Sequence, residues 1–161
     1  MKMQNKNYVS FLIVAVFIAS MFFLISSMPR IFKLEDTKYV KIAGKIIKVE
    51  LAITQAEQIE GLSGHEPLRE REGMLFIFPE SGKYSFWMKD MNFPIDIIWL
   101  TPSEGGDASK ARVIYIKKDA RPESYPETYV SKEKAKYVLE VVSGFSDKNN
   151  LKVGNEITFS K

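Results

Sequence analysis

Three short apolar blocks decide the fold of this chain: Gly73-Met74-Leu75-Phe76-Ile77-Phe78-Pro79, Ser85-Phe86-Trp87-Met88-Lys89 and Pro94-Ile95-Asp96-Ile97-Ile98-Trp99. Each block has the length and the aromatic and β-branched composition of a strand, and turn residues separate the blocks. Lys89 and Asp96 stand among these apolar residues, where a charge is costly to bury. The blocks therefore predict short buried strands that carry a few charges in need of a partner.

Similar patterns on both sides of these blocks extend the prediction to a mainly β domain over residues 39–161. A capping box, Thr54 to Glu57, predicts a short helix to about Glu60, and a second short helix or turn is expected at 145–151. Many short strands with turns between them are typical of a single antiparallel β-sandwich or a partly open barrel. Strands are expected at 39–42, 45–52, 73–78, 85–89, 95–100, 112–117, 136–142 and 155–159.

The N-terminal segment has the pattern of a membrane anchor. Val9–Met28 is 20 residues long without a charge, enough to cross a hydrocarbon core of roughly 30 Å as a helix. Lys2 and Lys6 precede it, which favours a cytoplasmic tail at residues 1–8, a linker at 29–38 and the β domain on the extracytoplasmic side of the cytoplasmic membrane. The alternative is a signal peptide, with the domain secreted after cleavage.

The charge balance argues against a nucleic-acid partner. No acidic residue precedes Arg30, and 20 basic and 20 acidic residues follow it, so the basic excess belongs to the N-terminal flank. A nucleic-acid-binding domain normally shows a basic surface instead. The chain has no cysteine, which excludes disulfides, a thiolate metal site and a cysteine nucleophile.

Two carboxylates interrupt apolar strand faces. By strand alternation Ile95, Ile97 and Trp99 share one face of their strand and leave Asp96 on the other, and Glu140 is likewise the lone charge on its face in 137–142. If Asp96, Glu140 and Lys89 converge, they form a partly buried constellation. It would serve as an acid/base pair, as the polar floor of a ligand cleft, or as a structural network that satisfies backbone groups.

The remaining candidates are contact residues. Trp87 or Trp99 is expected to keep one edge in water, and Tyr125 and Tyr129 lie on the long connection 118–135, where exposed contact residues are common. His65 is the single histidine and cannot build a zinc site alone. Methionines in apolar strands, such as Met74, are expected to fill the core. No metal and no cofactor is predicted.

The chain resembles the DUF192 family, also called UPF0127, over roughly residues 44–160. The resemblance rests on six segments in matching order: Gly61-Leu62-Ser63-Gly64, Gly73-Met74-Leu75-Phe76-Ile77-Phe78, Ser85-Phe86-Trp87-Met88-Lys89, Ile95-Asp96-Ile97, Tyr137-Val138-Leu139-Glu140 and Leu151-Lys152-Val153-Gly154. It implies a mainly β, often exported domain and brings no known substrate or catalytic residue. His65 stands where the family commonly has arginine.

These observations lead us to expect a non-catalytic binding or accessory module for an envelope ligand or partner protein. Its ligand-binding residues would be drawn from Lys89, Asp96, Glu140, His65, Trp87, Tyr125 and Tyr129. Two alternatives stay open. One is a hydrolase or lyase that acts on envelope carbohydrate or peptide with Asp96 and Glu140 as its acid/base pair. The other is a structural subunit of a membrane complex, which would show an exposed apolar patch and no pocket.

Overall fold

The computed structural model describes residues 33–161 together with Ile18. The predicted transmembrane segment Val9–Met28, apart from Ile18, and the predicted cytoplasmic tail lie outside the described residues. Within the part of the chain that is described, no helix has the length and apolar character needed to span a membrane.

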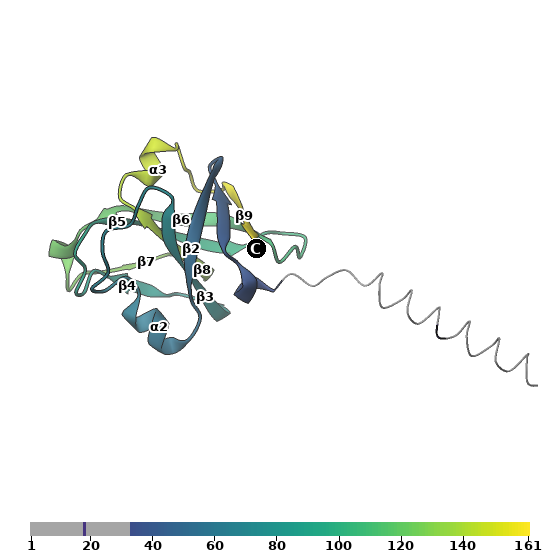
Figure 1. Cartoon of the computed structure of the whole chain (residues 1–161), viewed down its shortest axis with the longest axis horizontal. Coiled ribbons are helices and arrows are strands. Elements are labelled where there is room, and N and C mark those ends of the chain that lie inside the picture. The colour runs from purple at the N-terminus through teal and green to yellow at the C-terminus, as the bar shows by residue number, and fades with distance from the viewer. Residues whose placement is uncertain (1–17, 19–32) are drawn as a thin grey trace, which may run out of the picture. The chain divides into compact units, whose positions relative to one another are not determined.

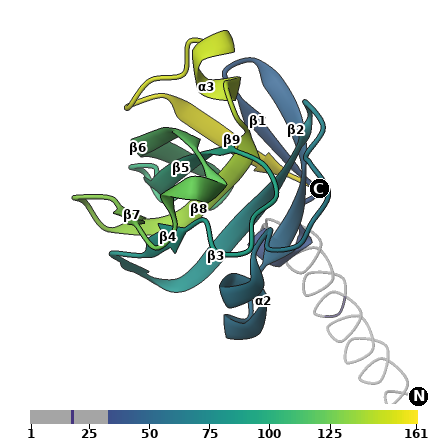
Figure 2. The same cartoon turned by 90° about the vertical axis from the view of Figure 1, so that its left-hand side faces the viewer.

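Seven strands close into a barrel in the order β1-β2-β3-β8-β5-β6-β9, and β9 pairs again with β1. A separate two-stranded sheet, β4 and β7, lies outside it, and helices α2 and α3 lie at opposite ends (Figure 1, Figure 2). The strands are β1 Tyr39–Ile42, β2 Lys45–Ala52, β3 Glu72–Gly82, β4 Ser85–Trp87, β5 Ile95–Pro102, β6 Lys110–Ala120, β7 Thr128–Val130, β8 Ala135–Val142 and β9 Glu156–Ser160. The helices are η1 Leu34–Asp36, α2 Gln55–Glu60, η2 Pro122–Ser124 and α3 Phe145–Lys148.

The mainly β prediction with two short helices is confirmed, and two of its details are wrong. The sheet is a closed barrel instead of a sandwich or a partly open barrel. One of its strand pairs, β2 with β3, is parallel, whereas an all-antiparallel sheet was expected. A parallel pair needs a crossover connection, and α2 with the segment after it carries the chain back to the end where β2 began.

Two hydrophobic cores form on the two faces of the barrel wall. The first fills the interior with side chains from all seven barrel strands, among them Ile42, Val49, Leu75, Ile98, Val113, Leu139 and Phe159. The second lies on the outer face of β3, β8, β5 and β6 beneath β4, β7 and the turn after α2, and includes Phe76, Phe86, Ile97, Trp99, Tyr129 and Val138. Strand β3 is therefore apolar on both faces, which explains why its sequence reads as a continuous apolar run.

Two segments predicted as irregular contain strand. Residues 79–82, which lie beyond the strand expected at 73–78, continue β3, because Gly82 pairs with Ala135 of β8 after a register shift. Proline has no backbone N–H group to donate, and a register shift of this kind lets Pro79 lie in the strand without breaking the regular pairing on either side. The predicted long connection 118–135 includes the end of β6, η2 and the strand β7 that pairs with β4.

Candidate functional site

The register between β5 and β8 separates the two carboxylates that the sequence suggested as a pair. Asp96 lies opposite Val141, whose side chain is in the interior core, whereas Glu140 lies opposite Ile97, which is in the outer core. Directly opposed residues in a strand pair point to the same face of the sheet. Asp96 and Glu140 therefore point to opposite faces, and the predicted Lys89–Asp96–Glu140 constellation does not form.

Asp96 is a structural residue. Its side chain is fully buried and accepts three backbone hydrogen bonds, at 2.9 Å from the amide of Asp119, 3.2 Å from Gly144 and 2.8 Å from Ser146. The first amide belongs to an irregularity in β6, where Asp119 has a φ of 48°. The other two belong to the start of α3, where free amide groups favour a carboxylate. Asp96 thus ties β5, β6 and α3 together.

Glu140 has the opposite environment. Its side chain is 5% exposed, and its Oε2 atom is buried without a hydrogen-bond partner among the described residues. The other buried unpartnered side-chain oxygens there belong to hydroxyl groups, of Thr37, Ser103 and Ser146, which cost less to bury than a charge. Burial raises the pKa of the Glu140 carboxyl from 4.5 to about 8.

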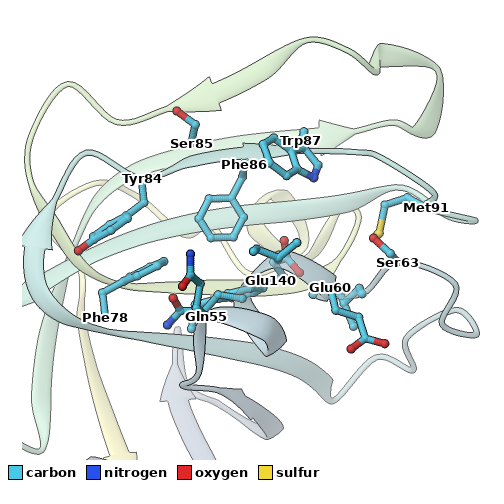
Figure 3. A pocket seen from close by; sticks show the side chains of 15 residues that line it. Gln55, Glu60, Ser63, Phe78, Tyr84, Ser85, Phe86, Trp87, Met91 and Glu140 are labelled. Atoms are coloured by element: carbon cyan, nitrogen blue, oxygen red, sulfur yellow. The ribbon is translucent and has the colours of Figure 1, made fainter.

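Glu140 lines a pocket of about 190 Å³ on the outer face of the barrel (Figure 3). Helix α2 and the turn after it form one side, and Tyr84 with strand β4 forms the other. In Figure 3 Phe78 and Tyr84 lie at one end, Ser63 and Met91 at the other, and Glu140 between them. The lining residues are Gln55, Gln58, Ile59, Glu60, Gly61, Leu62, Ser63, Phe76, Phe78, Tyr84, Ser85, Phe86, Trp87, Met91 and Glu140.

Aromatic rings pack tightly along the pocket. Phe78 and Tyr84 stack with their centroids 3.5 Å apart, and Phe76 meets Phe86 edge to face at 4.8 Å. Phe86 packs in turn on the fully buried Trp99, whose indole Nε1 donates a 3.1 Å hydrogen bond to the carbonyl of Tyr84. These contacts hold the aromatic side of the pocket in one arrangement.

Polar contacts fix the α2 side of the pocket. The side-chain Nε2 of Gln58 donates to the carbonyls of Ala52, Ile53 and Ile77 at 3.0 to 3.3 Å. These hydrogen bonds anchor α2 to β2 and β3. The Ser63 hydroxyl donates to the carbonyl of Lys89 at 2.9 Å. Gly61 has a φ of 51°, and an added Cβ would lie 3.3 Å from the Phe76 ring, so a larger residue there would be strained and crowded.

Of the other predicted site residues that are not buried, one lines the pocket and three lie outside it. Trp87 is 43% exposed and lines the pocket. Lys89 is exposed and does not line it, and His65 lines a separate hollow of about 120 Å³ beside β2. Tyr125 is exposed but is not part of the pocket.

The prediction that Tyr129 is an exposed contact residue is wrong. Tyr129 is 7% exposed, because β7 pairs with β4 and packs its ring into the outer core, where Lys117 Nζ lies 4.3 Å from the ring centroid. Met74 and Met88 are core residues, as expected. Within residues 33–161, no three acidic or histidine side chains lie close enough together to hold a metal ion.

Sequence reasoning missed the contribution of α2 to the site. Gln55, Gln58 and Ile59 all line the pocket, and no residue of α2 is buried. One signal was present: Ile59 is the single large apolar residue of a short polar helix, and it is 61% exposed. A lone isoleucine two residues before a helix-ending glycine is too weak a sequence pattern to locate a pocket.

We predict that Asp96→Asn lowers the free energy of unfolding by about 2–4 kcal/mol, because an amide cannot accept all three backbone hydrogen bonds. Urea unfolding followed by circular dichroism measures the loss. Asp107→Asn is the matched control, since Asp107 also accepts a backbone hydrogen bond, from Ser109, but is exposed. Equal effects of the two substitutions would contradict the structural role of Asp96.

We predict that Glu140→Gln changes how stability depends on pH. Between pH 4.5 and about 8 the unfolded chain releases the Glu140 proton and the folded chain keeps it, so the free energy of unfolding falls as pH rises. The full loss is on the order of 5 kcal/mol. Urea unfolding at several pH values should show that Glu140→Gln removes this slope, while Glu66→Gln at an exposed site keeps it. An unchanged slope in Glu140→Gln would show that Glu140 is not the group responsible.

Comparisons with known proteins agree with this fold. A search of curated proteins finds no match. A protein of unknown function from Novosphingobium aromaticivorans is 28% identical with a TM-score of 0.66, and the match covers 74% of this chain and 82% of that one. A Sinorhizobium meliloti protein described as a candidate transcription regulator is 26% identical with a TM-score of 0.64, covering 75% and 90%. The model of the DUF192 family, described as "Uncharacterized ACR", matches residues 38–159, and the chain therefore belongs to this family.

Proposed function

We propose that this protein is a non-catalytic binding module, anchored in the cytoplasmic membrane by Val9–Met28, that holds a small group of an envelope ligand or partner protein in the Glu140 pocket. The observation that carries the proposal is that Glu140 lines the pocket and that its Oε2 atom is buried without a hydrogen-bond partner in the described residues. A buried carboxyl oxygen is costly unless something completes its hydrogen bonding. A bound ligand would supply the missing donor.

The size and rigidity of the pocket support this proposal. Its volume of about 190 Å³ is below the range of about 300–1,000 Å³ for drug-sized ligands. A cavity of about 150 Å³ in another protein takes up benzene, so the pocket suits one ring or one head group. The stacked aromatic side and the anchored α2 side favour binding, because few side chains have to become ordered when a ligand binds and the entropy cost is therefore small.

The alternative of a hydrolase or lyase with Asp96 and Glu140 as an acid/base pair is not retained. The two carboxylates point to opposite faces of the sheet, and Asp96 is committed to three backbone amides. We also do not transfer the description of the Sinorhizobium meliloti protein, because acidic and basic residues balance after Arg30. A structural subunit becomes the better explanation if the pocket binds nothing.

The membrane anchor is tested by cell fractionation. We predict that the full chain stays in the membrane fraction after an alkaline carbonate wash, and that protease added outside spheroplasts removes a tag placed after Lys161. Replacing Val16 and Ala19 by arginine should release the protein, since charges at the centre of a hydrophobic segment oppose insertion. A wild-type chain found in the carbonate supernatant would mean cleavage or no anchor.

Pocket binding is tested by titrating the full chain in an uncharged maltoside detergent with four probes: phenol, methyl glucoside, acetate and choline. We expect at least one probe to shift the NMR signals of the Gly61 and Ser63 amides and the Trp87 indole, leaving Gly105 unchanged. Trp87→Ala should weaken that binding several-fold, because it removes an aromatic wall. Tyr125→Ala, at a similarly exposed aromatic residue outside the pocket, should not. No shift with any probe would overturn the proposed function.

A further inference from the structure

The charged residues that line the pocket are all acidic. Glu60 contributes a carboxylate from the exposed end of α2, and Glu140 contributes the buried one. The lining contains no lysine, arginine or histidine. Once Glu140 is ionised, at a pH near or above its pKa of about 8, a bound anion would therefore meet two carboxylates without any positive charge to offset them, whereas a cation would meet two groups that attract it.

The walls that surround these carboxylates are also suited to a cation. Five aromatic residues line the pocket (Phe76, Phe78, Tyr84, Phe86 and Trp87), and the flexible thioether of Met91 lies at one end. Aromatic rings attract cations to their faces, and the attraction grows when the cation is shielded from water. The same rings supply apolar area for the methyl or methylene groups that an organic cation carries.

The buried oxygen of Glu140 completes the argument. It has no donor among the described residues, and the residues directly opposite it on both neighbouring strands, Met74 on β3 and Ile97 on β5, carry no charge. Carboxyl oxygens in protein interiors are normally paired with a positive group or hydrogen-bond donors. Glu140 belongs to the pocket lining, so a positive group bound in the pocket would lie beside this side chain.

We propose that the Glu140 pocket binds a small organic ammonium group, with the positive charge against Glu140 and the carbon substituents among the aromatic side chains. This inference rests on the proposed function and names the class of ligand. The ammonium group can belong to a free alkylamine or to the head group of a larger molecule, and the chemistry at the pocket is the same in both. The volume of about 190 Å³ accommodates such a group without a long chain.

Ammonium binding has a characteristic pH dependence. In the empty pocket the pKa of Glu140 is about 8, so below that pH a cation binds only as the carboxyl releases its proton. Two other titratable groups line the pocket: Glu60, which is exposed, and Tyr84, whose pKa burial raises. Affinity for a cation that does not itself titrate should rise about tenfold per pH unit up to pH 8 and then level off.

The test compares choline with 3,3-dimethyl-1-butanol, its uncharged carbon isostere, in NMR or calorimetric titrations of the full chain. At pH 9 we expect choline to bind at least about tenfold more tightly than the isostere. Between pH 9 and pH 6 choline binding should weaken by more than about tenfold, because the Glu140 carboxyl takes up its proton over this range, while binding of the isostere changes little. Glycerophosphocholine, which carries the same ammonium on a head group, shows whether a larger source of the ammonium is also accepted.

Glu140→Gln should remove most of the preference for choline and its pH dependence, while Glu66→Gln, an exposed change outside the pocket, should keep both. Retained binding of the isostere by Glu140→Gln shows that the variant is folded. Equal or tighter binding of the isostere by the wild-type protein, or tighter binding of choline at pH 6 than at pH 9, would overturn the ammonium inference and leave the proposed function standing. If neither these two compounds nor the other probes bind, both fail.

Discussion

The pairing of β8 with β3 on one side and with β5 on the other determines where the two buried carboxylates of this structure lie. It places Glu140 between Met74 and Ile97 on the outer face, and it places Asp96 beside Val141 on the inner face. Gly73 makes this register tight, because a Cβ there would lie 2.5 Å from the carbonyl oxygen of Glu140. A shift of one residue in either ladder would exchange the two faces and move Glu140 into the barrel interior.

The two carboxylates show how one functional group serves two purposes in the same wall. Asp96 receives three amide donors from a strand irregularity and a helix start, so its burial organises the chain around it. Glu140 receives no donor at its buried oxygen from the described residues and lies at a pocket. Buried polar groups with complete hydrogen bonding stabilise a fold. A buried polar group without a hydrogen-bond partner costs free energy of folding, and that cost calls for an explanation other than packing.

Local patterns in the sequence predicted the elements well and their arrangement less well. The limits of β1, β2 and α2 were predicted correctly, and alternation placed Ile95, Ile97 and Trp99 on one face of β5. Alternation could not reveal that the face carrying Asp96 turns inward while that carrying Glu140 turns outward, because this depends on which strands become neighbours. The parallel β2–β3 pair and the burial of Tyr129 depend on the same long-range choices. For the site, Glu140 and Trp87 were identified, and the α2 residues were not.

The parallel crossover between β2 and β3 separates two tasks along the chain. Hydrogen bonds between the seven barrel strands close the barrel. Helix α2, which has no buried residue, lies outside the barrel and forms one wall of the pocket. Substitutions at Gln55, Ile59 or Glu60 can therefore reshape what enters the pocket without disturbing the strands that carry Glu140. The selectivity of such a domain can diverge quickly while its framework stays the same.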